Sequence, residues 1–268
     1  MISDHPPPEP TVRGALEGRE RWGREPPTSA GATATGSRPE GRGLARRTVG
    51  RARERLLDAV FPARCVGCDR EGEALCPACA PALESRLLAP AGVPIGLPGD
   101  IPAPLLQLEW CAPFRGIVRN VLHGIEYGGE RRLARPLGQA VARRWARVGI
   151  GADLVTHVPV HAERARVRGY DQAELIAREA AAALWLPFEP LLVRTRATIA
   201  QFDLDRDRRA TNVTDAFALR PGETPPTGRW ILLIDDVTTT GATLAACATA
   251  LLGSGAHAVS AVTVARER

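Results

Sequence analysis

Lysine is absent from the 268 residues of this chain, so all 35 of its basic residues are arginine. Aromatic residues are also scarce, at 4% of the sequence. No apolar stretch approaches the roughly 20 residues that a helix needs to span a membrane. The first residues lack the basic and apolar regions that together form a secretion signal. From these absences we expect a cytoplasmic protein without a membrane span.

The charge of the chain suits a phosphate-bearing partner but does not identify one. The formal net charge is +5 and the isoelectric point is about 9.2. The planar guanidinium group of arginine matches phosphate oxygens. The abundance of alanine, glycine and proline also indicates a GC-rich genome, whose codon usage favours arginine. The charge therefore leaves open whether the partner is a nucleic acid or a small phosphorylated ligand.

Composition divides the chain into four segments. Residues 1–43 hold seven prolines and seven glycines but few large apolar side chains, which predicts a disordered N-terminal extension. Residues 44–87 combine a helical pattern with a cysteine cluster. Residues 88–108 are rich in proline, which is typical of a linker. Residues 109–268 contain the longest periodic segments and are expected to form the main domain.

Within the main domain, segments with helical periodicity alternate with short apolar runs. The apolar runs fall at 153–160, 190–194, 230–235 and 258–265. The helical patterns fall at 114–129, 133–148, 170–185 and 242–255. This alternation predicts an α/β fold with a parallel sheet flanked by helices.

The stretch WILLIDDVTTTGATL, residues 230–244, ends a buried strand on two carboxylates, Asp235 and Asp236. Adjacent carboxylates repel each other, but vicinal hydroxyls of a sugar can each donate to one of them. The turn that follows leads into a helix, whose N-terminal N–H groups favour an anion. The residues expected to bind a phosphate there are Thr238, Thr239, Thr240, Gly241, Ala242 and Thr243.

Two simpler explanations of this turn are less complete. An Asx turn followed by a threonine N-cap explains one aspartate and one threonine, but not the whole run. The chain has no Walker A motif, and the turn is not the glycine-rich turn of a dinucleotide-binding fold. A ribose 5-phosphate group is therefore the ligand that the turn predicts.

A second cluster of charge follows the apolar run at 153–160. Arg164, Arg166 and Arg168 occupy alternate positions before Gly169 and can stabilise the charge of a leaving pyrophosphate. A solvated basic loop explains the same pattern when it is considered alone. His157 lies in the preceding run, where a structural role is the commoner one for histidine.

Four cysteines, Cys65, Cys68, Cys76 and Cys79, form the pattern C-x₂-C-x₇-C-x₂-C. Four thiolates match the tetrahedral preference of Zn²⁺ and leave no open position for catalysis. The pattern therefore predicts a structural zinc site. An iron–sulfur cluster or redox use of the thiols are the alternatives.

The stretch from Ile231 to Thr243 resembles the PRPP-binding motif of type I phosphoribosyltransferases. The blocks VPVHAERARVRGYDQAELIA and RTRATIAQFDLDRDRRATNVTDAF are similar to two blocks of the ComF family, whose members carry an N-terminal zinc ribbon. Relative to these patterns, Thr239 replaces a catalytic aspartate of the purine-salvage enzymes, and Glu126 stands where the ComF family often has lysine.

The resemblance implies a type I phosphoribosyltransferase fold over residues 109–268, preceded by a small zinc ribbon. It implies that Asp235 and Asp236 hold the ribose of PRPP, with Mg²⁺ bound to PRPP itself. The chain is then either a transferase that moves the phosphoribosyl group to a nitrogen nucleophile, or a PRPP sensor that binds single-stranded DNA. Some family members serve competence and DNA uptake, which would add proteins of the competence machinery as partners.

Overall fold

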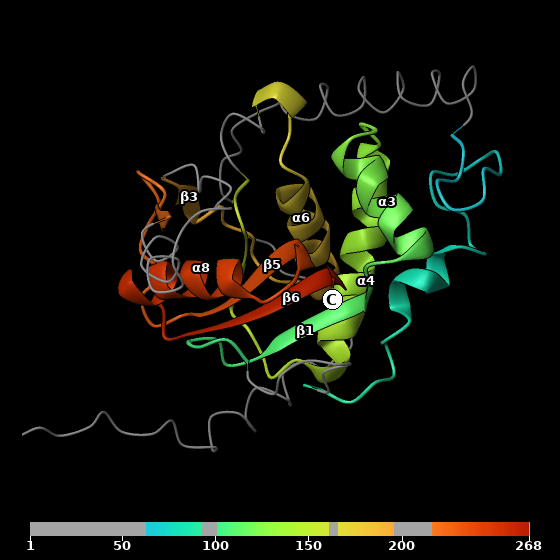
Figure 1. Cartoon of the computed structure of the whole chain (residues 1–268). Helices are drawn as coiled ribbons and strands as arrows, with labels where there is room; N and C mark the ends of the chain where they lie inside the picture. Colours follow the sequence, from blue (N-terminus) through green and yellow to red (C-terminus); the bar gives the residue numbers. More distant parts are fainter. Residues whose placement is uncertain (1–62, 93–100, 161–165, 196–215, 268) are drawn as a thin grey trace, which may run out of the picture.

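The structure is a computed structural model that describes residues 63–92, 101–160, 166–195 and 216–267. Its centre is a four-stranded sheet in which every neighbouring pair of strands is parallel (Figure 1). The strand order is β1-β6-β5-β2, so β5 and β6 are the central strands. The strands are β1 (Leu108–Pro113), β2 (Leu154–His157), β5 (Trp230–Thr238) and β6 (Ala258–Arg266).

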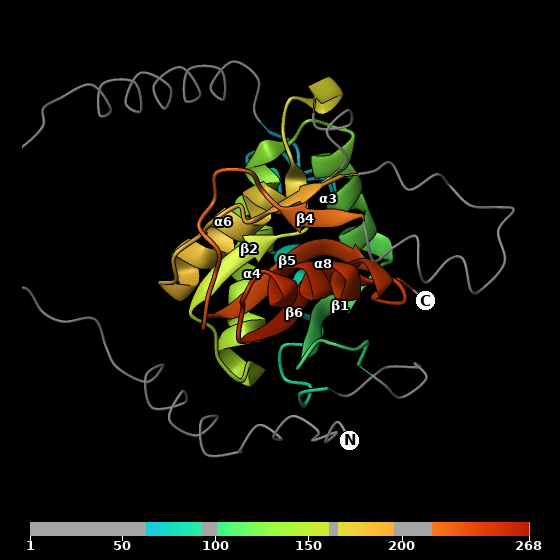
Figure 2. The same ribbon diagram turned by 90° about the vertical axis from the view of Figure 1, so that its left-hand side faces the viewer.

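Helices cover both faces of the sheet, as Figure 2 shows. Helices α4 (Ala134–Val148) and α6 (Gln172–Leu184) pack against each other on one face. Helix α8 (Ala242–Gly253) covers the other face, together with the hairpin of β3 (Leu192–Arg194) and β4 (Phe217–Leu219). The predicted α/β fold with a parallel sheet flanked by helices is therefore confirmed.

Strand β5 explains why a single apolar run can serve two cores. Leu232 and Ile234 belong to the cluster under α4 and α6, whereas Ile231 and Leu233 belong to the cluster under α8. All four side chains are fully buried. Successive strand residues point to opposite faces, so a strand covered on both sides must be apolar throughout.

Strand β5 is longer than its apolar run indicates. It continues through both aspartates to Thr238, because β6 extends beside it and pairs Asp235 with Thr263 and Thr238 with Arg266. The predicted end of the strand at residue 235 is therefore wrong by three residues. The partner strand, rather than the local sequence, sets this end.

The elements before α4 connect the cysteine segment to the sheet. The short helix η1 (Ala80–Glu84) follows the cysteines, and α3 (Gly116–Glu126) follows β1. A further short helix, η2 (Arg131–Leu133), leads into α4. Leu105 and Leu108, in the segment predicted to end a linker, are buried in the core under α8. Leu106 N donates to Val259 O at 2.9 Å, so this segment lies along the amino end of β6.

A buried ion pair fixes the cysteine segment to the sheet. Arg144 of α4 donates to Glu109 Oε2 of β1 from Nε at 3.1 Å, and its guanidinium also donates to the carbonyls of Arg86 (2.8 Å) and Ala89 (2.6 Å). The side chains of Arg144 and Glu109 are 1% and 0% exposed. One guanidinium thus joins a helix, a strand and the chain that leaves the cysteine cluster.

We expect Arg144→Met to lower the free energy of unfolding by about 3–5 kcal/mol, because Glu109 is then buried without a counter-charge. Urea unfolding measures this loss. Arg147→Met, an exposed arginine of the same helix, is the control and should change stability by less than about 0.5 kcal/mol. Adding Glu109→Leu to Arg144→Met should restore part of the loss; equal effects at 144 and 147 would refute the assignment.

Candidate functional site

The turn between β5 and α8 lies at the carboxyl end of the central strands, where parallel α/β sheets place ligands. Gly241 is the N-cap of α8 and has a φ of +80°. A Cβ at this position would also lie 2.6 Å from Pro102 Cγ. Glycine is therefore required twice, for the backbone angle and for the close approach of Pro102.

The start of α8 presents its donors to the outside. No side chain caps this end of the helix, and Thr239, Thr240, Ala242 and Thr243 are exposed. The first N–H groups of a helix have no partner within it and carry partial positive charge. Arg266 Nη2 donates to Thr239 O at 3.1 Å, which adds a cation that the sequence pattern did not identify. Thr238 differs from the other predicted phosphate ligands, because it is buried and paired in β5.

The two aspartates are held by different partners. Asp235 Oδ1 accepts from the N–H of Asp236 at 2.9 Å. Asp236 Oδ1 accepts from Val237 N at 2.7 Å, and its Oδ2 accepts from Gln172 Nε2 at 3.1 Å. Both residues keep part of their surface accessible, although protein atoms closely surround the carboxyl groups. Each carboxyl therefore has one side fixed and can still meet a ligand.

The environment opposes ionisation of both aspartates. Desolvation by the surrounding protein, together with the charge of Asp236, raises the pKa of Asp235 well above its ordinary value. Desolvation also raises the pKa of Asp236, against the hydrogen bonds from Gln172 and its own neighbours. Adjacent acids that are costly to ionise are typical of sites that a ligand completes.

A chain of polar contacts joins Asp236 to the predicted pyrophosphate loop. Gln172, the first residue of α6, donates to Asp236 and accepts a hydrogen bond from Arg168 Nη1. Arg168 Nη2 in turn pairs with Glu126 Oε1 of α3 at 3.2 Å. The sequence analysis did not select Gln172, although the residue lies within the quoted ComF-like block.

The three predicted pyrophosphate arginines have different positions. Arg168 reaches the two aspartates through Gln172, as described above. Arg166 is exposed, and no contact between it and Arg168, Gln172 or Asp236 occurs in the described part of the chain. Arg164 lies outside the described residues.

Asp171 and His157 support the site from below. Asp171 is the N-cap of α6, accepting from Glu174 N at 3.2 Å and from Val160 N at 2.9 Å. His157 Nε2 lies 3.6 Å from Asp171 Oδ2. Burial acts to raise the pKa of Asp171, but His157 and the N–H donors outweigh it and lower that pKa. Since His157 is only 1% exposed, these contacts favour the structural role over ligand binding.

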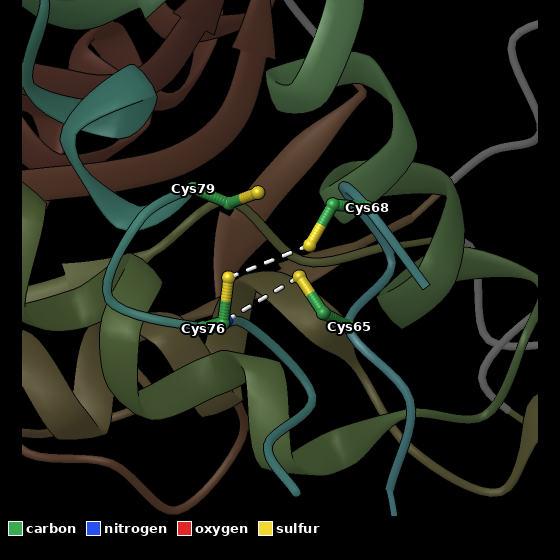
Figure 3. A group of neighbouring side chains, drawn as sticks. All are labelled: Cys65, Cys68, Cys76 and Cys79. Carbon is green, nitrogen blue, oxygen red and sulfur yellow. Dashed lines mark hydrogen bonds between the residues drawn. The ribbon is translucent and has the colours of Figure 1, made fainter. Parts of the chain in front are cut away.

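The four predicted metal ligands come together in space. The Sγ atoms of Cys65, Cys68, Cys76 and Cys79 all lie within 4.8 Å of one another (Figure 3). Cys68 Sγ and Cys76 Sγ are 3.6 Å apart, which fits two ligands on one tetrahedral ion with Zn–S bonds of about 2.3 Å. Three of the cysteines are buried. The residues present therefore fit a closed metal site of the zinc-ribbon type.

Backbone donors prepare the cluster for a cation. The N–H groups of Cys76 and Gly67 donate to Cys65 Sγ at 3.3 and 3.4 Å. Burial opposes ionisation of this thiol, but the donors outweigh it and lower the pKa of Cys65 to about 6. Burial and the neighbouring thiols raise the pKa of Cys79 to about 12, which a bound dication would reverse.

The cysteine segment shares the core of the main domain. Its cysteines and Leu83 belong to the same buried cluster as α3, α4 and α6. A Cβ on Gly67 would lie 2.8 Å from Cys79 Sγ and 3.1 Å from Ile117 Cγ2 of α3. The metal site therefore sets the position of α3 as well as the fold of its own segment.

Known proteins resemble the chain over most of its length. It is 31% identical over 203 residues to DNA utilization protein YhgH of Escherichia coli, across 73% of this chain and 85% of that protein. Competence protein F of Haemophilus influenzae is 33% identical over 118 residues, which is 43% of this chain and 51% of that protein. The chain belongs to the ComF family. The predicted family is thus confirmed, although no protein-family model matches the chain.

Solved structures with partial overlap are phosphoribosyltransferases. Glutamine PRPP amidotransferase from B. subtilis covers 49% of this ComF-family chain and 26% of its own, at 23% identity and a TM-score of 0.35. Adenine phosphoribosyltransferase from Leishmania tarentolae covers 56% and 75%, at 13% identity and a TM-score of 0.34. Among the described residues, no helix is long and apolar enough to cross a bilayer.

We expect one zinc ion per chain in the purified protein, measured by elemental analysis. Cys65→Ser or Cys76→Ser should remove it, and should lower the melting temperature by roughly 5 °C or more, because the site contributes to the shared core. Cys247→Ala is the control, since Cys247 is buried in α8, away from the cluster. Full zinc content in the two serine variants would contradict the ligand assignment.

The two aspartates should make stability depend on pH. Because their pKa values are raised in the folded chain, their contribution is greatest below the ordinary carboxyl pKa of about 4 and is lost as pH rises through the raised values. Asp235→Asn should remove this loss and stabilise the ligand-free protein at pH 7 by roughly 0.5–2 kcal/mol.

Urea unfolding at several pH values measures this effect. Asp153→Asn is the matched control, because Asp153 lies at the amino end of the same strand, where it accepts from Trp230 N. No gain in stability is expected there. A loss of stability in Asp235→Asn at pH 7 would show that the carboxylate is favourable where it stands.

Proposed function

We propose that this ComF-family chain binds PRPP at the carboxyl end of β5. The observation that carries the proposal is the chain of contacts from Asp236 through Gln172 to Arg168. It joins two acids suited to a diol with a cation suited to a pyrophosphate, beside a helix start suited to a third phosphate. PRPP presents these three groups in one molecule.

Each part of the donor has a counterpart in the chain. Asp235 and Asp236 hold the two ribose hydroxyls, and the exposed N–H and hydroxyl groups of residues 239–243 hold the 5-phosphate. Arg168 holds the pyrophosphate, with Arg164 and Arg166 as further cations of the same loop. Mg²⁺ accompanies the donor through its own pyrophosphate and hydroxyl oxygens, because divalent ions of this kind prefer phosphate oxygen ligands.

The reaction that such a site supports is phosphoribosyl transfer. A bond forms between C1 of the ribose and a nitrogen nucleophile, the bond from C1 to the pyrophosphate oxygen breaks, and pyrophosphate leaves with the electron pair. Arg168 stabilises the charge that develops on the leaving group. Thr239 offers no carboxylate to take the proton from the nucleophile, so the site suits an acceptor nitrogen that needs no base from this turn.

A second candidate is a sensor that binds PRPP without transferring it and contacts single-stranded DNA. The observation in its favour is the name of the E. coli relative, a DNA utilization protein. Proteins of the competence machinery would be its partners. A cytoplasmic location fits both candidates, since a reducing compartment keeps the cysteine cluster as thiolates.

Calorimetry with PRPP and Mg²⁺ tests the binding that both candidates share. We expect Asp235→Asn/Asp236→Asn to weaken binding about 10- to 100-fold, because each lost charge-assisted hydrogen bond is worth about 1.5–3 kcal/mol. Arg168→Ala should weaken it by a similar factor. Asp153→Asn is the control and should bind like the unaltered chain; an unaltered chain that does not bind PRPP would end the proposal.

Release of pyrophosphate in the presence of candidate nitrogen acceptors separates the two functions. Turnover supports the transferase. Binding of PRPP with no release of pyrophosphate for any acceptor supports the sensor.

A further inference from the structure

Helix α3 carries a row of aromatic rings in a chain that has few. The ring of Phe114, just before the helix, lies 6.0 Å from that of His123, which lies 5.7 Å from Tyr127 at the end of the helix. His123 and Tyr127 are four residues apart and so share one face of the helix. The row, defined here as Phe114, His123 and Tyr127, therefore follows α3 from end to end.

The last ring of the row is turned to solvent. Tyr127 is 73% exposed, which is unusual for a large aromatic side chain that has no apolar surface to cover. The other tyrosine of the chain shows the contrast. Tyr170 donates from its hydroxyl to Ile125 O, and the Arg131 guanidinium covers its ring at 4.5 Å. Tyr170 thus has a structural role, whereas the exposed ring of Tyr127 remains accessible to a partner.

Arginines accompany the row at both ends. Arg115 and Arg119 are exposed at the start of α3. At its end, the Arg168 guanidinium lies 5.6 Å from the centre of the Tyr127 ring. Guanidinium groups attract phosphates and also stack on π-faces. An accessible ring between cations matches a ligand that alternates flat bases with phosphates.

The two ends of α3 meet two different hollows of the molecule. A cavity of about 520 Å³ lies between η1 and the junction of β1 with α3, lined by Ala82, Arg86, Arg115 and Ile117 among others. At the other end, Glu126 pairs with Arg168, which reaches Asp236 through Gln172. The aromatic row thus connects the cavity beside the cysteine segment with the candidate donor site.

We propose that α3 is a nucleobase-binding face, on which a base stacks against Tyr127 while Arg115 and Arg119 hold the phosphates of a strand. The base comes either from single-stranded nucleic acid or from a free nucleoside, and the row of arginines favours the strand. The proposal rests on the proposed function only for what lies at the end of the row. It names the residues that bring a base next to the sugar phosphate.

Fluorescence anisotropy of a labelled oligothymidylate of about 12 nucleotides tests the face. We expect Tyr127→Ala to weaken binding about tenfold or more, and Tyr127→Phe to retain it, because the ring rather than the hydroxyl provides the stacking. Trp185→Ala is the matched control, since Trp185 is 89% exposed at the far end of α6. Equal binding by Tyr127→Ala and Trp185→Ala would overturn the proposal.

Further measurements separate the source of the base and the role of the arginines. Calorimetry with free thymidine shows whether a nucleoside alone is bound; binding that Tyr127→Ala abolishes supports the same face with a different source. The variant Arg115→Gln/Arg119→Gln should reduce the dependence of oligonucleotide affinity on salt, because fewer counterions are released. An unchanged salt dependence would overturn the phosphate role of these two residues.

The outcome is distinguishable from that of the proposed function. Asp235→Asn/Asp236→Asn should lose PRPP but keep the affinity for the oligonucleotide, since the aspartates lie outside the aromatic row. A chain that binds no PRPP but binds the strand through Tyr127 would overturn the proposed function and leave the nucleobase face supported.

Discussion

The buried guanidinium of Arg144 is the contact on which the arrangement of the molecule depends. It neutralises Glu109 in β1 and satisfies carbonyl groups of the chain that leaves the cysteine cluster. Burying both charges is costly, so the pair is maintained only where every donor has an acceptor. As a result the cysteine segment, the edge strand and α4 are fixed together, and α3 is held between the cysteines and the sheet.

Placing α3 in this way brings two polar regions into contact. The end of α3 supplies Glu126 to Arg168, and the start of α6 supplies Gln172 to Asp236. The metal cluster thereby influences the candidate donor site without touching it, because it sets the position of the helix that carries Glu126. The same helix carries the aromatic row, so the two proposed ligands would meet near its end.

Much of the candidate site could be predicted from the sequence, because it lies within contiguous stretches. The turn at residues 238–243 and the four cysteines follow from local spacing, and the structure brings the cysteines within ligand distance of one another. The roles of Gln172 and Arg266 could not be predicted, since each lies far along the chain from the group it contacts. Glu126 was noted only as a departure from a family pattern, and its ion pair with Arg168 gives that departure a physical reason.

The sequence by itself determined the class of fold, because a strand buried on both faces must be apolar and a helix covering it must be periodic. It also determined the metal ligands, whose spacing in each pair places two sulfurs together. Only the tertiary structure decided the end of β5, the strand at Leu108–Pro113 and the partners of the two aspartates. These depend on hydrogen bonds and burial between segments distant in the chain, which no local pattern records.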